Sequence, residues 1–192
     1  KFTRTLIALS AATLMATSAM AMEPAEYKAA KDQISADYKA NKQKCDALQG
    51  NAKDVCQKEA KGAEKVAKAE LDARYKPSDK TAYKAREAKA DADYEVAKEK
   101  CDDLSGNAKD VCVKDAKAAH VSAKENAKVA PAAAKPADNP AAKQADVAEA
   151  RKDAAAEKNE ANYKAAKERC DALSGDAKSK CVDDAKRVHG QN

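Results

Sequence analysis

The sequence predicts an all-α protein of three disulfide-stapled antiparallel helical hairpins, a repeat array whose third hairpin sits on a Pro/Ala-rich tether. Three observations lead to this fold class. Residues with high helix propensity dominate the chain, one segment with a central glycine occurs three times, and every copy carries two cysteines at the same spacing. Charged residues make up 36% of the chain and Trp is absent, so the helices cannot enclose a thick core.

The first 21 residues have the three parts of a secretory signal peptide. Lys1 and Arg4 precede an apolar run, which ends in the small-residue triplet Ala19-Met20-Ala21. The run is shorter than the roughly 20 apolar residues that a membrane-spanning helix needs. We therefore expect cleavage near Ala21, a mature chain beginning near Met22, and no stable membrane insertion after cleavage.

The repeated segment defines the helical units. It runs from Tyr38 to Cys56, from Tyr94 to Cys112 and from Tyr163 to Cys181, with offsets of 56 and 69 residues between copies. Repeats of this size indicate an array of supersecondary units. On both sides of each central glycine, apolar residues recur at helical spacing, which is typical of a short antiparallel coiled coil.

A glycine followed by a polar residue marks the turn of each unit. Glycine readily adopts the left-handed conformation that ends a helix, and Asn or Asp can cap the next one. The predicted turn and cap residues are Gly50 with Asn51, Gly106 with Asn107, and Gly175 with Asp176.

The six cysteines form three pairs with ten residues between the partners. On one unbroken helix this spacing is a rise of about 16 Å, too long for a disulfide. In a hairpin folded at the glycine the two cysteines face each other across the turn. An even cysteine number in an exported protein also favours bridges. The predicted disulfides are Cys45–Cys56, Cys101–Cys112 and Cys170–Cys181.

Helix breakers set the predicted boundaries. Lys76-Pro77-Ser78-Asp79 should stop one helix and cap the next, and Pro131, Pro136 and Pro140 indicate an extended Ala/Pro/Lys linker. The expected organisation is a signal peptide at 1–21, hairpin 1 at 22–76, hairpin 2 at 77–128, the linker at 129–141 and hairpin 3 at 142–192.

The sequence offers no constellation for catalysis, so we expect a non-enzymatic protein without a cofactor. His120 and His189 occupy equivalent positions in different units and cannot share one site, and no nucleophile motif is present. The adjacent acidic pairs Asp102-Asp103 and Asp183-Asp184 point in different directions on a helix. Zinc sites use closer cysteine pairs than these, so no metal site is predicted. Acidic residues interrupt the Ala/Lys/Pro stretch, which argues against nucleic-acid binding.

The repeat resembles that of a group of Gram-negative exported Ala/Lys-rich cysteine-repeat proteins, often labelled TolA-like cell-envelope proteins. The resemblance lies in Tyr38 to Cys56, Tyr94 to Cys112 and Tyr163 to Cys181. It implies a cell-envelope location. The chain departs from TolA itself because it ends in a third hairpin rather than in a separate globular domain, so a role in the Tol system is not carried over.

These observations favour an exported, periplasmic structural or stress-related helical repeat protein of the cell envelope. Its partner would be an unknown envelope protein or a second copy of the chain. Two alternatives stay open. One is a chaperone-like protective hydrophilin, and the other is a protein that binds a metal or exchanges electrons through its cysteines.

Overall fold

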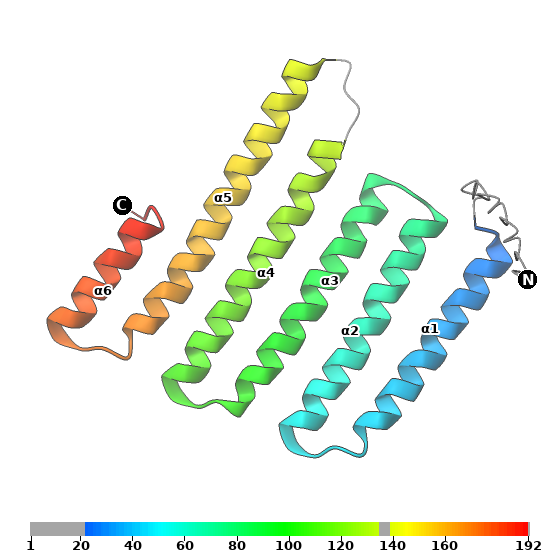
Figure 1. Cartoon of the computed structure of the whole chain (residues 1–192), viewed down its shortest axis with the longest axis horizontal. Coiled ribbons are helices and arrows are strands. Elements are labelled where there is room, and N and C mark those ends of the chain that lie inside the picture. The colour runs from blue at the N-terminus through cyan, green and yellow to red at the C-terminus, as the bar shows by residue number, and fades with distance from the viewer. Residues whose placement is uncertain (1–21, 135–138, 192) are drawn as a thin grey trace, which may run out of the picture.

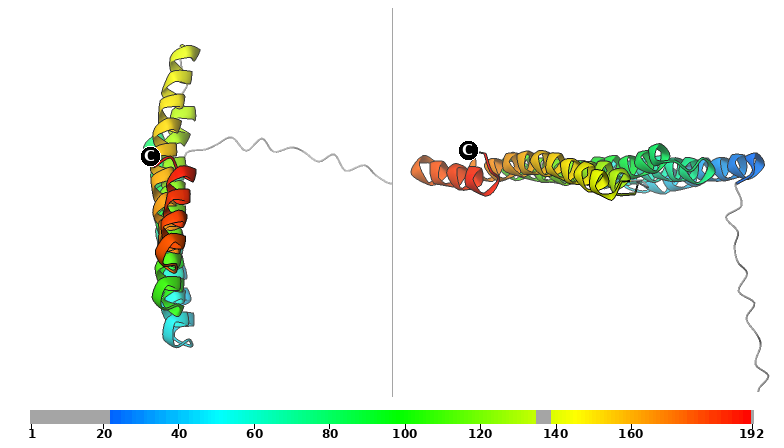
Figure 2. Two further views of the ribbon diagram at one scale, coloured as in Figure 1. Left: turned by 90° about the vertical axis from the view of Figure 1, so that its left-hand side faces the viewer. Right: turned by 90° about the horizontal axis from the view of Figure 1, so that it is seen from above.

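The computed structural model describes residues 22–134 and 139–191, and these residues form six α-helices and one short 3₁₀ helix without any strand. The helices run up and down in chain order, side by side (Figure 1). The two edge-on views show that they form a single layer (Figure 2). The helices are α1 (Pro24–Cys45), α2 (Gly50–Tyr75), α3 (Asp79–Lys100), α4 (Gly106–Ala134), α5 (Pro140–Cys170) and α6 (Gly175–Val188), with η1 (Cys101–Asp103) after α3. The predicted all-helical class with three disulfides is confirmed.

Local sequence explains where two of these helices begin. The Ser78 hydroxyl accepts a hydrogen bond from the Thr81 backbone N–H at 3.1 Å and so caps α3. The Asn139 side chain accepts from the N–H groups of Ala141 and Ala142, and Pro140 follows it at the first helical position. Proline suits this position because its missing N–H would have no partner there.

A single layer leaves both broad faces of every helix in water, so the core consists of narrow seams between neighbours. The largest fully buried side chains are Leu71 and the first cysteine of each pair, and most other buried apolar residues are alanines. Small residues let the helix backbones approach closely. A Cβ built on Gly62 of α2 would lie 2.9 Å from the Cβ of Ala92 on α3, a separation that real Cβ atoms essentially never show.

The helix pairs that belong to different units, α2 with α3 and α4 with α5, pack more extensively than the pairs within a unit. The expectation of a third hairpin on a tether is therefore wrong. Lys158 of α5 donates a hydrogen bond to Asn126 of α4 at 2.6 Å, and Ala154 of α5 is 3% exposed. The alanine-rich surfaces of the two helices bury each other, as small residues do elsewhere in the layer.

The predicted linker at 129–141 is also shorter than expected. Helix α4 continues through Pro131 to Ala134, and α5 already begins at Pro140. A proline inside a helix removes one backbone hydrogen bond and clashes with the preceding turn. Near the last turn of α4 this penalty is smallest, because few later residues depend on the disturbed turn. Pro136 lies outside the described residues.

Candidate functional site

The three disulfides hold the two helices of each unit together at the turn. Cys45–Cys56, Cys101–Cys112 and Cys170–Cys181 have Cα–Cα distances of 5.5, 5.6 and 5.7 Å. These are the three pairs that the spacing predicts. The first cysteine of each pair is fully buried, and no cysteine is free. A thiolate for metal binding or redox exchange would first require reduction of a bridge.

Each turn glycine has the predicted positive φ, at +56° for Gly50, +54° for Gly106 and +57° for Gly175. It lies at the beginning of the second helix, however, and not at the end of the first, which stops at or before the buried cysteine. In each turn a lysine of the second helix pairs with the aspartate that follows the first cysteine. The pairs are Lys53–Asp46 at 3.5 Å, Lys109–Asp102 at 3.0 Å and Lys178–Asp171 at 2.9 Å.

The predicted capping role of Asn51, Asn107 and Asp176 is wrong, because each of these residues lies inside a helix that already begins at the preceding glycine. Residue Gln49 occupies the cap position of α2, and no side chain bonds there. The Asn51 amide instead donates to the backbone carbonyl of Glu99, in the next unit, at 3.1 Å. This carbonyl lies in the last turn of α3 and also accepts from the Cys101 N–H, so the Asn51 amide adds a second donor to it from the neighbouring unit.

The same contact recurs at the second unit boundary. The Asn107 amide, in the orientation that satisfies both of its groups, donates to the Glu168 carbonyl at 3.2 Å and accepts from the Ala172 N–H at 3.1 Å. Glu99 and Glu168 are equivalent in the repeat. Asn51 and Asn107 are thus docking residues that join consecutive units.

Ion pairs repeat across the same two boundaries. Lys58 of α2 pairs with Glu95 at 3.1 Å and Glu99 at 3.6 Å, and its equivalent Lys114 pairs with Glu168 at 3.8 Å. A second series has reversed signs, with the acidic residue on the earlier helix. It comprises Glu59 with Lys100 at 3.2 Å and Asp115 with Arg169.

Sequence reasoning missed these docking residues, although a signal was present. Asn, Lys and an acidic residue recur at the same positions of the second helix in units one and two. The third unit breaks this pattern at its Asp176 and Asp183, which replace the Asn and the Lys. A carboxylate cannot donate to a carbonyl. The departure therefore marks the unit that has no successor among the described residues.

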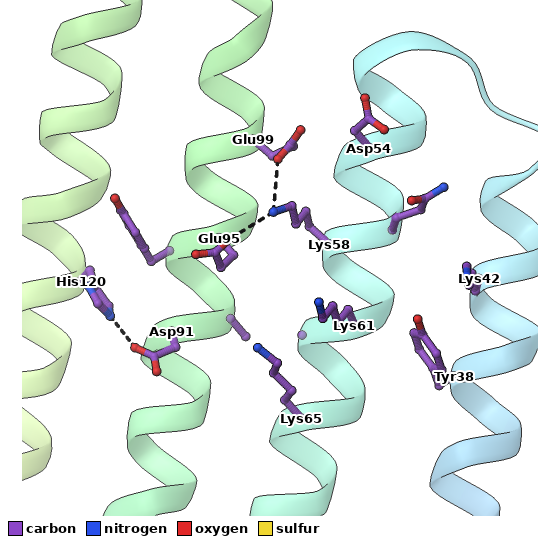
Figure 3. Close-up of a pocket in the computed structure, with 14 residues that line it drawn as sticks. Tyr38, Lys42, Asp54, Lys58, Lys61, Lys65, Asp91, Glu95, Glu99 and His120 are labelled. Atoms are coloured by element: carbon purple, nitrogen blue, oxygen red, sulfur yellow. Dashed lines mark hydrogen bonds and ion pairs between the residues drawn. The ribbon is translucent and has the colours of Figure 1, made fainter.

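A groove of about 610 Å³ runs along one face of the layer between α1, α2 and α3, and α4 contributes to one side of it. Figure 3 shows Lys58, Lys61 and Lys65 projecting from α2 into this groove. Tyr38 and Lys42 line it from α1, and α3 supplies three carboxylates opposite the lysines. These carboxylates belong to Asp91, Glu95 and Glu99.

His120 closes the groove on the α4 side. Its Nε2 lies 2.6 Å from a carboxylate oxygen of Asp91, and its ring stacks on Tyr94 with centroids 4.7 Å apart. The His120 side chain is 10% exposed and its Nδ1 is buried without a hydrogen-bond partner. Lys117 also lies over the Tyr94 ring, 5.3 Å from its centroid. The second histidine, His189, lies in another unit at the end of α6, so the structure does not bring the two together.

Hydrogen bonds between neighbouring helices shift the pKa values of two ion pairs, one in the groove between α2 and α3 and one between α3 and α4. The hydrogen bond with Lys58 lowers the pKa of Glu95 from its usual value and raises the pKa of Lys58. Between α3 and α4, Lys124 lies 2.8 Å from Glu87. This hydrogen bond lowers the pKa of Glu87 and raises the pKa of Lys124. Both shifts keep the pairs charged over a wider pH range.

The remaining acidic candidates make local contacts. Asp102 and Asp103 lie in η1, and Asp183 and Asp184 bind Lys186 and Arg187 one turn further along α6. Within residues 22–134 and 139–191, no group of three histidine, cysteine or acidic side chains is placed to hold a metal ion. In the same residues, every helix is too short or too polar to cross a bilayer.

Comparison of the chain with protein-family models, with curated proteins and with solved structures found no match in any of the three. The geometry of the docking residues, the disulfides and the groove is thus the basis for assigning a function.

Proposed function

We propose that the protein is a non-catalytic scaffold of the cell envelope, exported to the periplasm and oxidised there. The observation that best supports this proposal is that the two unit boundaries repeat the same contacts. An asparagine–carbonyl bond and two ion pairs with opposite polarity join each unit to the next. Such repetition builds a broad layer from little apolar material, as in other repeat proteins.

Three further features support the proposal. The disulfides fit an oxidising compartment. Residues 1–21 have the composition of a secretory signal. The groove carries lysines and carboxylates in close alternation, and such a surface suits weak ionic contacts with many partners better than a single buried ligand. These features favour a spacer or docking platform among envelope components.

The first experiment is an intact mass and a non-reducing disulfide map of the protein recovered from the periplasmic fraction. We expect a mature chain beginning near Met22 with the three local bridges. A chain that remains in the cytoplasmic fraction with six free thiols would overturn the proposed location and restore the metal and redox alternatives.

A second experiment separates a scaffold from a protective hydrophilin. The oxidised protein and a matched variant with all six cysteines changed to serine are compared in a client-aggregation assay. A hydrophilin acts through composition, so both forms would suppress aggregation equally. A scaffold depends on its folded layer, and we expect neither form to protect the client. Equal protection by both forms would contradict the scaffold.

A further inference from the structure

Helix α1 forms one end of the layer and packs substantially only against α2 among the described residues (Figure 1). Its opposite side carries small and polar residues at helical spacing, and all of them are exposed. We call this surface the α1 edge. It consists of Ala25, Ala29, Asp32, Ala36, Ala40 and Gln43.

Within the layer, the equivalent surface is a docking face. Ala29, Ala36 and Ala40 correspond through the 56-residue offset to Ala85, Ala92 and Val96 of α3. Ala92 is the residue against which Gly62 of α2 makes its closest approach. The α1 edge therefore has the shape of a surface that accepts a second helix at short distance.

The other end of the layer is built differently. The positions of α6 that correspond to the docking face of α4 carry charged residues, which are Asp176, Lys180, Asp183, Asp184 and Arg187. Lys180 replaces the Val111 of α4, and Arg187 replaces Ala118. A polar outer surface is how repeat arrays end. The α6 end is thus capped, and the α1 end is not.

The α1 edge also differs from an inner docking face in its charges. Lys39, which borders the α1 edge, occupies the position of Glu95 in α3, and Gln43 occupies the position of Glu99. The edge therefore lacks the two carboxylates with which Lys58 pairs at the inner boundary. Head-to-tail addition of another copy would place Arg187 of its α6 at the position of Gly62, against Ala36, and this long side chain leaves no room for the close approach that Gly62 and Ala92 make. The edge is instead complementary to itself. In an antiparallel pair centred near Ala36, the Asp32 of each copy lies opposite the Lys39 of the other.

We propose that the α1 edge binds a second copy of this chain through a two-fold axis, with α1 antiparallel to its counterpart. Ala36 lies at the crossing point, and two Asp32–Lys39 pairs flank it. Neighbouring helices of the layer already run antiparallel, so the dimer continues the up-and-down order. A single helix pair is at the low end of interface sizes, and the dimer is accordingly weak and concentration-dependent. This inference goes beyond the scaffold role and does not depend on it.

Sedimentation equilibrium of the purified, oxidised chain tests the proposal between about 10 μM and about 1 mM, the range of weak interfaces. We expect the mass to rise from monomer to dimer and no further. Ala36→Arg should leave a monomer, and the control Ala155→Arg, at an exposed position of α5, should not change the dimer. A monomer at every concentration would overturn the proposal, as would a dimer that survives Ala36→Arg.

Charge reversal tests the antiparallel register. Asp32→Lys places like charges opposite each other twice and should weaken dimerisation about tenfold, and Lys39→Asp should do the same. The double variant reverses both charges and should return to within about twofold of the original affinity. Both positions are exposed, so circular dichroism should show unchanged helicity. Failure of the double variant to recover would refute the register.

Discussion

Asn51 and Asp176 occupy equivalent positions after their turn glycines, and they differ only in whether the side chain can donate a hydrogen bond. Asn51 donates to the Glu99 carbonyl of the next unit at 3.1 Å. After Asp176 there is no following unit among the described residues, so a donor at this position would have no carbonyl of a next unit to bind. Sequence reasoning identified both positions but assigned them to capping, because Asn and Asp after a turn glycine usually serve their own helix. Only the position of the next helix reveals the partner.

The first prediction concerns this bond. Asn51→Asp should lower the free energy of unfolding by about 1 kcal/mol, because the Glu99 carbonyl loses the second of its two donors and faces a carboxylate instead. Urea unfolding followed by circular dichroism measures the change. The matched control is Asp176→Asn, for which we expect no change above about 0.5 kcal/mol. Equal effects of the two substitutions would show that the bond between the units contributes nothing.

The second prediction concerns pH and the Lys58–Glu95 pair. The folded-state pKa of Glu95 is lowered from its usual 4.5, mainly by the hydrogen bond from Lys58. The resulting stabilisation is present above pH 4.5 and is lost as the pH falls through the lowered value. Both side chains are more than a third exposed, so the contribution is below about 1 kcal/mol. Thermal unfolding between pH 7 and pH 3 should show a smaller acid-induced loss for Glu95→Gln than for the unmodified chain. Identical pH profiles would contradict this prediction.

The sequence predicted the helices, turns and disulfides better than it predicted the contacts between units. The boundary at Pro77 and Ser78, the three turns and all three disulfide pairs could be predicted, because each depends on residues close together in the chain. The end of α4 could not. Pro131 indicated a linker, yet packing against the rest of the layer carries α4 three residues further, to Ala134. Tertiary contacts of this kind override local propensity, and no local pattern encodes them.

The third prediction compares two disulfides. Each bridge closes a short loop and should stabilise its unit by about 3 kcal/mol. Among the described residues, helix α6 has only 14 residues and packs substantially only against α5, whereas α3 and α4 are also held by α2 and α5. Replacing Cys170 and Cys181 by serine should therefore expose the amides of α6 to rapid hydrogen exchange. The matched replacement of Cys101 and Cys112 should lower global stability but leave α3 and α4 protected. Equal protection of α6 in both variants would show that α6 does not need its bridge.

For the whole molecule, the sequence predicted units but not how they join. The two unit boundaries rest on alanine and glycine seams and on ion pairs between residues far apart in the chain. From the sequence alone, an alanine on a solvent-exposed helix surface cannot be distinguished from an alanine in a closely packed helix contact, because alanine favours helix formation in both. Ala154, at 3% exposure, and the exposed Ala155 beside it show the ambiguity. The composition around the prolines then favoured a tether, and the docking of α5 on α4 was missed.

The fourth prediction tests this docking. Ala154→Arg places a guanidinium in the seam between α4 and α5. The alanines of this seam leave no space for the side chain and offer its charge no carboxylate. The third unit should then separate from α4 while keeping its own disulfide, and it should hang from the segment between α4 and α5. Small-angle X-ray scattering should show a larger radius of gyration, and non-reducing peptide mapping should still find Cys170–Cys181. Ala155→Arg, one residue away and exposed, should leave the scattering curve unchanged. An unchanged curve for Ala154→Arg would mean that the α4–α5 seam accepts a large charged side chain, and that the layer is held together mainly by its turn-end contacts, Asn107 with Glu168 and Asp115 with Arg169.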